Sequence, residues 1–285
     1  MLSRQCRDEN FPDPGCSNFQ TSFPVMSTIM PIIMLRKGVV KFGRINASKK
    51  YHRILLDMSN EGNKGPPSAI TLGFSTLTHF LLVAPVIYIL VVACQNYSFF
   101  SWHPICMSVG VGLLVAEAVF SVSGEAYVSW KLPRRSRVTI HWILHTIGLT
   151  VIGIGFIIII VHKVNHNYHH FATTHSQLGL TTIILTVLAA TFGILANNTV
   201  WIYPRVRPIL VKVAHACGGI GITILLLATL INGTYSNWFS AAGTDVGRDL
   251  TFASLFFAGV LILVKPILGA VSRCRVIFGP PSSDT

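Results

Sequence analysis

Charged residues are scarce in this chain, and acidic ones are the scarcest. Lysine, arginine, aspartate and glutamate make up 11% of its 285 residues, and aspartate and glutamate together number 10. Soluble domains carry about 25% charged residues, whereas hydrophobic residues account for 51% of this sequence. The composition therefore excludes an ordinary soluble globular protein and favours one that lies in a membrane.

Cysteines are also few, and their spacing matches no metal-binding or disulfide pattern. The six cysteines include no C-x-x-C pair, and half of them fall in or beside apolar stretches. Such spacing excludes a disulfide framework, a zinc ribbon and the C-x-x-C-H motif that attaches a cofactor covalently.

Long hydrophobic runs, by contrast, are abundant. An α-helix needs about 20 apolar residues to cross a bilayer, and six stretches of the sequence meet that requirement. We therefore predict an all-α membrane protein with six transmembrane helices, at residues 71–94, 100–123, 139–162, 175–196, 209–231 and 250–271.

The placement of the positive charge predicts the orientation of these helices. With six spans, 20 of the 22 lysines and arginines fall on one face, and Lys163 and Arg248 alone fall on the other. Cationic loops stay cytoplasmic, so both termini are predicted to be cytoplasmic. The net charge of +12 is therefore a topology signal and a surface for anionic membrane lipid, and we expect no nucleic-acid partner.

Four consecutive spans each carry a histidine near their start: His103, His141, His175 and His215. An ionisable residue inside a membrane span is costly and usually functional. In an up-and-down bundle, the first and third of these histidines enter from one face and the other two from the opposite face. Alternate helices of a four-helix ring lie diagonally opposite, so each pair can meet across the core.

Two imidazoles that face each other across an apolar bundle suit the two axial positions of a haem iron. The pattern predicts a central four-helix bundle enclosing two non-covalent haems b per chain. His103 and His175 would hold the haem on the non-cytoplasmic side, and His141 and His215 the haem on the cytoplasmic side. His145 lies one turn deeper than His141 on the same helical face, so spacing alone leaves the choice between them open.

The motifs around these histidines are similar to those of the cytochrome b561 family. They are Phe99-Phe-Ser-Trp-His-Pro-x-x-Met, Glu117-Ala, Arg-x-x-x-His141-Trp, Thr-x-His175-Ser-x-x-Gly-Leu and Lys212-x-x-His215. Residues 72–276 most resemble the short, single-domain transmembrane reductases of animals. The resemblance implies two b-type haems and electron transfer from cytoplasmic ascorbate to monodehydroascorbate radical or ferric iron on the other side. It also favours His141 over His145 as the ligand.

Cations near the cytoplasmic haem are candidate ascorbate-binding residues, because ascorbate is an anion near neutral pH. The candidates are Arg135, Arg137, Arg207 and Lys212. The alternative is that they serve topology alone. The family's lysine close before the third-span ligand is absent, since Thr139 stands two residues before it.

A histidine-rich outer loop at residues 162–170 contains the candidate acceptor-side residues His166, His169 and His170. Imidazoles at this spacing can bind a transition metal ion, although a solvated interfacial loop is the simpler interpretation. A polytopic metal-ion transporter that uses this loop is the alternative function. Against it, Glu117 is the single buried carboxylate expected in the spans, and a transport path for hard cations requires several oxygen ligands.

Glu117 and His79 are two further polar residues inside spans. Glu117 lies fourteen residues after His103, about 21 Å deeper along the helix. There it would tune the potential of the cytoplasmic-side haem or accept a proton; the alternative is a structural hydrogen bond to a neighbouring helix. His79 belongs to no predicted pair, and we interpret it as a packing histidine.

The sequence divides into three parts. Residues 1–68 are polar, basic and predicted to be a disordered cytoplasmic segment; residues 69–276 form the six-helix domain; residues 277–285 form a short cytoplasmic tail. Translation from Met58 would keep all six spans, so the presence of residues 1–57 in the main product is left open. We expect an endomembrane location, in the endoplasmic reticulum or a vesicle, and leave a homodimer open.

Overall fold

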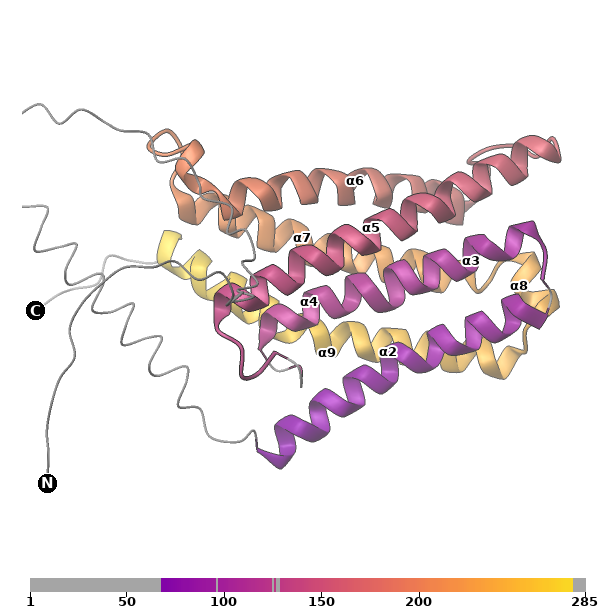
Figure 1. Ribbon diagram of the computed structural model, residues 1–285, viewed down its shortest axis with the longest axis horizontal. Helices are drawn as coiled ribbons and strands as arrows, with labels where there is room; N and C mark the ends of the chain where they lie inside the picture. Colours follow the sequence, from indigo (N-terminus) through magenta and orange to yellow (C-terminus); the bar gives the residue numbers. More distant parts are fainter. Residues whose placement is uncertain (1–67, 96, 125, 127–128, 279–285) are drawn as a thin grey trace, which may run out of the picture. The chain divides into compact units, whose positions relative to one another are not determined.

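The computed structural model describes residues 68–95, 97–124, 126 and 129–278 (Figure 1). The N-terminal segment predicted for residues 1–68 lies almost wholly outside the described residues, as do residues 279–285. The described part contains six helices long and apolar enough to cross a membrane. This confirms the six predicted spans, whose observed bounds are α2 (Ala69–Gln95), Phe99–Ser123, α5 (Arg134–Asn165), α6 (Thr174–Asn197), α7 (Pro208–Gly233) and α9 (Asp245–Phe278).

The second span is a composite of four consecutive segments. It begins with the 3₁₀ turn η1 (Phe99–Ser101), continues as α3 (Trp102–Met107), widens into the π-helical segment η2 (Ser108–Val115) and ends as α4 (Ala116–Ser123). A π segment of this kind shifts the rotational phase of the helix that follows it, and such segments concentrate at functional sites. Here it separates two parts of one span, α3 and α4, that each contact a different histidine pair.

Several helices begin earlier than the hydrophobic runs predicted. Helix α5 starts at Arg134, five residues before the predicted start, because Pro133 holds an extended N-cap with φ −61° and ψ 152°. Helix α7 starts at Pro208, a residue suited to the first helical position because it has no N–H to satisfy. The arginines assigned to a loop therefore lie in the first turn of α5. His141 lies seven residues inside this helix instead of at its start.

Packing contacts link all six spans in one bundle. The second span packs on α5 and on α2, α6 packs on α7, and α9 packs on both α2 and α7. Segment η2 also contacts α7, so the second span adjoins both α5 and α7. The fully buried side chains of Leu82, Phe120, Leu255 and Ile262 form the core between α2, α4 and α9.

Close approach of α5 to the second span depends on glycine. A Cβ on Gly110 of η2 would lie 2.7 Å from Cγ1 of Ile152 on α5, well inside van der Waals contact. Gly148 of α5 faces the same segment, since a Cβ there would lie 3.0 Å from Cγ2 of Val115. Small residues at the contact allow two membrane helices to approach at backbone distance.

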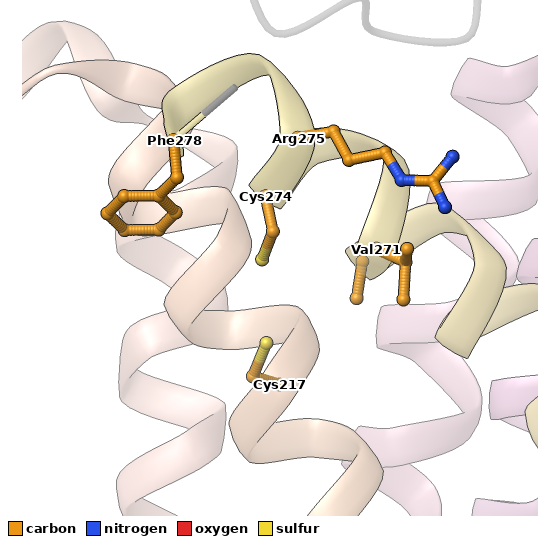
Figure 2. Close-up of a pocket in the computed structure, with 6 residues that line it drawn as sticks. Cys217, Val271, Cys274, Arg275 and Phe278 are labelled. Carbon is orange, nitrogen blue, oxygen red and sulfur yellow. The ribbon is translucent and has the colours of Figure 1, made fainter. Parts of the chain in front are cut away.

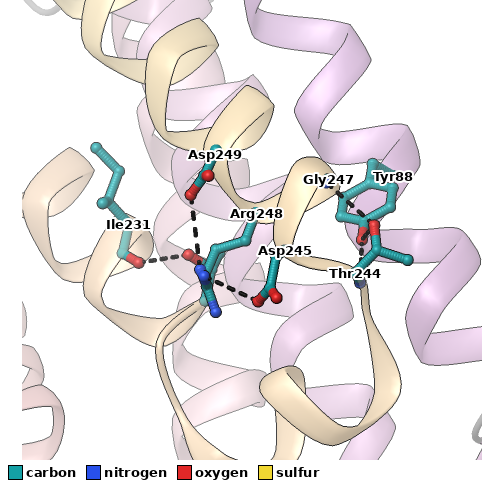
Figure 3. A network of polar contacts seen from close by, with 8 residues as sticks. Tyr88, Ile231, Thr244, Asp245, Gly247, Arg248 and Asp249 are labelled. Atoms are coloured by element: carbon teal, nitrogen blue, oxygen red, sulfur yellow. Dashed lines mark hydrogen bonds and ion pairs between the residues drawn. The ribbon is translucent and has the colours of Figure 1, made fainter.

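A polar contact ties α2 to the start of α9 at the opposite end of the bundle from α5's N-terminus (Figure 3). The hydroxyl of Tyr88 accepts the backbone N–H of Thr244 at 2.9 Å. The ring of Tyr88 occupies the space beside Gly247 where any Cβ would collide with it. Next to it, the guanidinium of Arg248 pairs with Asp245 at 2.9 Å, and the short helix α8 (Asn237–Ala242) precedes this junction.

Candidate haem-binding sites

The structure brings the four predicted histidines together as two facing pairs. The ring centroids of His103 and His175 are 6.2 Å apart with an interplanar angle of 83°. Those of His141 and His215 are 6.4 Å apart at 88°. In both pairs the imidazole planes are nearly perpendicular, and in both pairs one ring comes from the second span or α5 and the other from α6 or α7.

The first ring of each pair is fixed by a backbone carbonyl. His103 donates through Nδ1 to the carbonyl of Gly155 on α5 at 3.0 Å, and His141 donates through Nδ1 to the carbonyl of Ala118 on α4 at 2.8 Å. A carbonyl can only accept, so Nδ1 carries the proton and Nε2 keeps its lone pair. In metal sites, a hydrogen bond from the ring nitrogen that does not bind the metal orients the ligating histidine.

The second ring of each histidine pair lies against a neighbouring helix. His175 of α6 lies against α7, and His215 of α7 lies against α6. The Nδ1 atoms of His175 and His215 lie beside the backbones of Thr229 and Ala189. Among the described residues, no atom reaches full hydrogen-bond geometry with either Nδ1. These two rings are therefore held by packing more than by a formed hydrogen bond.

The ring separations fit an axially ligated metal centre. Two metal–imidazole bonds of about 2 Å on opposite sides of one ion place the ring centroids about 6 Å apart. The observed 6.2 and 6.4 Å match this spacing, and the fixed Nδ1–H of one ring in each pair leaves the lone pair of its Nε2 available to a metal ion. The residues present therefore fit two bis-imidazole haem sites.

The two pairs lie at different depths along the bundle. His141 and Gly155, which accepts from His103, are fourteen residues apart on α5, and this corresponds to about 21 Å of helix. His141 and His215 each lie seven residues after the first residue of their helix, while His103 and His175 each lie one residue after theirs. The matched positions give one site per half of the bundle.

In the structure, His145 lies beside the His141–His215 pair but is not part of it. Its ring packs edge-on against His141, with centroids 4.4 Å apart at 75°. His141 alone of the two carries the backbone hydrogen bond and the contact with His215 that are described above. Of the two residues, His141 is thus the one that faces His215.

Glu117 and His79 form a pair that the sequence did not reveal. Nδ1 of His79 on α2 donates to Oε1 of Glu117 on α4 at 2.6 Å. The ring of His79 also packs edge-on against Phe120, with centroids 5.4 Å apart. Interpreting His79 as an unpaired packing histidine was incomplete, because α2 and α4 are distant in sequence and spacing cannot show their contact. Of the two interpretations of Glu117, the observed geometry is the hydrogen bond to a neighbouring helix.

The predicted anion-binding cations lie at the end of the bundle that carries His141 and His215. Arg135 is in the first turn of α5, Arg207 is the N-cap of α7, and Lys212 follows in its second turn; all three are exposed. Arg137 is partly buried, and its guanidinium lies over Gly124, a residue with φ +76° that ends α4. A side chain at Gly124 would displace this guanidinium.

The predicted outer residues His166, His169 and His170 are all exposed. His166 packs against His162, with ring centroids 4.3 Å apart, and His162 in turn contacts Phe100, which also contacts His103. His169 is exposed and supplies its carbonyl to Lys163 at 2.9 Å.

These histidines do not gather into a chelating group. His170 is exposed and packs on Phe171. Within the part of the chain that the structure describes, no three histidine, cysteine or acidic side chains form a group that could hold a metal ion.

A shallow apolar hollow of 410 Å³ opens between α7 and α9 near the end that carries the cations (Figure 2). Its lining includes Cys217 and Cys274, both free thiols whose side chains point toward one another in Figure 2. Cys217 is exposed on α7.

Comparison with known proteins agrees with this architecture. The family model "Eukaryotic cytochrome b561" matches residues 102–240, a segment that contains all four facing histidines. The transmembrane reductase CYB561D2 of Homo sapiens is 29% identical over 202 residues, covering 70% of this chain and 89% of the human protein. The Mus musculus protein of the same name is 31% identical over 170 residues, which cover 58% of this chain and 74% of the mouse protein.

A more distant relative has a more specific name. The lysosomal membrane ascorbate-dependent ferrireductase CYB561A3 of Mus musculus is 28% identical over 140 residues, covering 49% of this chain and 57% of that protein. Family match, six spans and paired histidines lead to one conclusion: this chain is a multi-pass membrane protein that belongs to the cytochrome b561 family of transmembrane reductases.

Proposed function

We propose that this protein carries electrons across a membrane through two non-covalent b-type haems. His103 and His175 would hold one haem, and His141 and His215 the other. The observation that carries the proposal is the pair of centroid separations, 6.2 and 6.4 Å, at two depths of one bundle. When bound, each haem supplies reversible one-electron oxidation and reduction.

The chain's own residues would fix the ligands and exclude water. The carbonyls of Gly155 and Ala118 hold the Nδ1–H of His103 and His141, which keeps Nε2 directed at the metal position and raises the donor strength of the ring. The apolar spans around both sites keep them dry, and this lowers the reorganisation that accompanies a change of charge. About 21 Å separates the two sites along α5, so together they reach across most of a hydrocarbon core of about 30 Å.

Ascorbate is the proposed electron donor, at the end that carries His141 and His215. Arg135, Arg137, Arg207 and Lys212 would bind it there. Two helix N-termini, those of α5 and α7, point their unpaired backbone N–H groups toward the same end, and such N-termini favour anions. The name of the CYB561A3 relative, an ascorbate-dependent ferrireductase, supports the choice of ascorbate.

Monodehydroascorbate radical or ferric iron is the proposed acceptor at the other end, beside His103 and His175. The outer residues His166, His169 and His170 would bind the acceptor there. The excess of lysine and arginine at the donor end would make that end cytoplasmic, in an endomembrane. A homodimer remains compatible with this arrangement.

Visible spectroscopy and haem analysis of the purified protein test the cofactor. We expect two haems b per chain by pyridine haemochrome assay, both low-spin and both reduced by ascorbate. One haem or none per chain would contradict the proposal. The His145→Ala variant is the matched control for His141→Ala, and it should retain both haems.

Proteoliposomes test the direction of transfer. Ascorbate is trapped on the side of Arg207 and Lys212, and a ferric chelate is placed on the other side. We expect the haems to be reduced by ascorbate and then reoxidised by the chelate, as ferrous iron appears outside. Equal reduction when ascorbate is supplied only on the opposite side would contradict the assignment of the donor face.

A further inference from the structure

Each histidine contributed by α6 and α7 packs against a glycine of the other helix. A Cβ on Gly193 of α6 would lie 3.1 Å from Cε1 of His215 on α7. A Cβ on Gly233 of α7 would lie 3.0 Å from Cε1 of His175 on α6. Carbon atoms in favourable contact are about 3.5–4.0 Å apart. At both positions, therefore, any side chain would push the imidazole away from its present place.

Gly193 and Gly233 each follow, by four residues, a second residue whose backbone lies beside the same histidine ring. Ala189 precedes Gly193 by four residues and lies beside His215. Thr229 precedes Gly233 by four residues and lies beside His175. In an α-helix the carbonyl of residue n accepts the N–H of residue n+4. The side chain at n+4 points back over that turn and covers the carbonyl from outside.

A glycine at n+4 therefore leaves the carbonyl of residue n open to a second donor. A backbone carbonyl oxygen has two lone pairs, so it can accept this second hydrogen bond while it keeps its helical one. The Nδ1–H of His215 can approach the Ala189 carbonyl, and that of His175 the Thr229 carbonyl, because no Cβ intervenes. His103 and His141 already make the equivalent Nδ1–H bond to a backbone carbonyl, at 3.0 and 2.8 Å respectively.

We propose that Gly193 and Gly233 are positioning residues, each of which opens one backbone carbonyl to the Nδ1–H of a haem-ligating histidine on the neighbouring helix. Gly193 acts on the site of His141 and His215, and Gly233 on the site of His103 and His175. Their effect is on the orientation and donor strength of the ring, both of which depend on the partner of Nδ1. The inference rests on the proposed haem ligation.

The test is a pair of alanine variants read by electron paramagnetic resonance of the oxidised protein. Each low-spin ferric haem gives a signal whose position depends on the orientation of its two imidazole planes. We expect Gly193→Ala to shift only the signal that His215→Ala removes, and Gly233→Ala only the signal that His175→Ala removes. A redox titration of each variant should show one changed midpoint and one parental midpoint.

Gly153→Ala and Gly269→Ala are the matched controls. Both glycines lie inside membrane helices, and a Cβ at either would meet no atom within 4 Å. These variants add the same methyl group to a helix and should keep both parental signals. The unaffected haem in each test variant shows in the same sample that the bundle has folded.

Three outcomes would overturn the proposal: parental signals in both test variants, a shift or loss of both signals in either one, or equal shifts in the controls. Failure of the proposed function is a different result. It would show as fewer than two haems in the parent protein, before any glycine is changed.

Discussion

Breaking the Glu117–His79 hydrogen bond should measurably lower the free energy of unfolding, because this bond joins α2 to α4. The bond is 2.6 Å long and joins two helices that are far apart in sequence, with side chains 19% and 31% exposed. Hydrogen bonds to charged groups contribute about 1.5–3 kcal/mol in soluble proteins. Interhelical hydrogen bonds measured in a membrane protein average about 0.6 kcal/mol, with a maximum of about 1.7.

The expected coupling lies between the membrane-protein average of about 0.6 kcal/mol and the lower limit of about 1.5 kcal/mol for hydrogen bonds to charged groups. The short distance favours the upper values, whereas partial exposure of both groups reduces the penalty for leaving one unpaired. We therefore expect a coupling of about 1 kcal/mol, which is about fivefold in the unfolding equilibrium constant. A double-mutant cycle measures this coupling by comparing the parent protein with Glu117→Leu, His79→Leu and the double variant.

Reversible unfolding in mixed detergent micelles provides the measurement. The control is Glu117→Gln, whose amide oxygen can still accept from Nδ1 of His79 and should retain part of the coupling. Mutations that do not interact add within about 0.3–0.5 kcal/mol. A coupling smaller than about 0.3 kcal/mol would refute the reasoning and show that the contact contributes nothing net to stability.

Three further predictions concern the sites and the junction of α2 with α9. His103→Ala and His175→Ala should each remove the same haem, while replacing either member of the other pair removes the second; haem analysis and spectra that group the variants differently would contradict the pairing. Replacing Arg207 and Lys212 together by Gln should slow reduction by ascorbate severalfold at low salt, and added salt should narrow the difference because it screens exposed charges; equal stopped-flow rates would leave these cations a role in topology alone. Tyr88→Phe removes the acceptor of a backbone N–H and should lower the free energy of unfolding by about 1 kcal/mol, and an unchanged unfolding midpoint would contradict that contribution.

The sequence alone determined the membrane class, the number of spans and the histidines. These properties depend on the one-dimensional pattern of apolar runs, because a bilayer requires helices of a minimum length that satisfy their own backbone hydrogen bonds. Position along a span also predicted which histidines share a depth. The structure agrees: His103 faces His175, and His141 faces His215.

Helix starts were predicted less well, for a local reason. Hydropathy placed the start of α5 at about residue 139, where the apolar run begins, but Pro133 starts the helix at Arg134. The polar first turn of a membrane helix lies outside the hydrocarbon and carries no hydrophobic signal, so capping geometry and not hydropathy decides where such a helix begins.

Which polar groups meet depends on the folded bundle and could not be predicted from the sequence. The Glu117–His79 pair, the carbonyls that hold His103 and His141, and the glycines beside His175 and His215 all join helices that are distant along the chain. The rotation of each helix about its axis sets these contacts. That rotation results from packing over the whole bundle, including the π segment in the second span, and no short stretch of sequence encodes it.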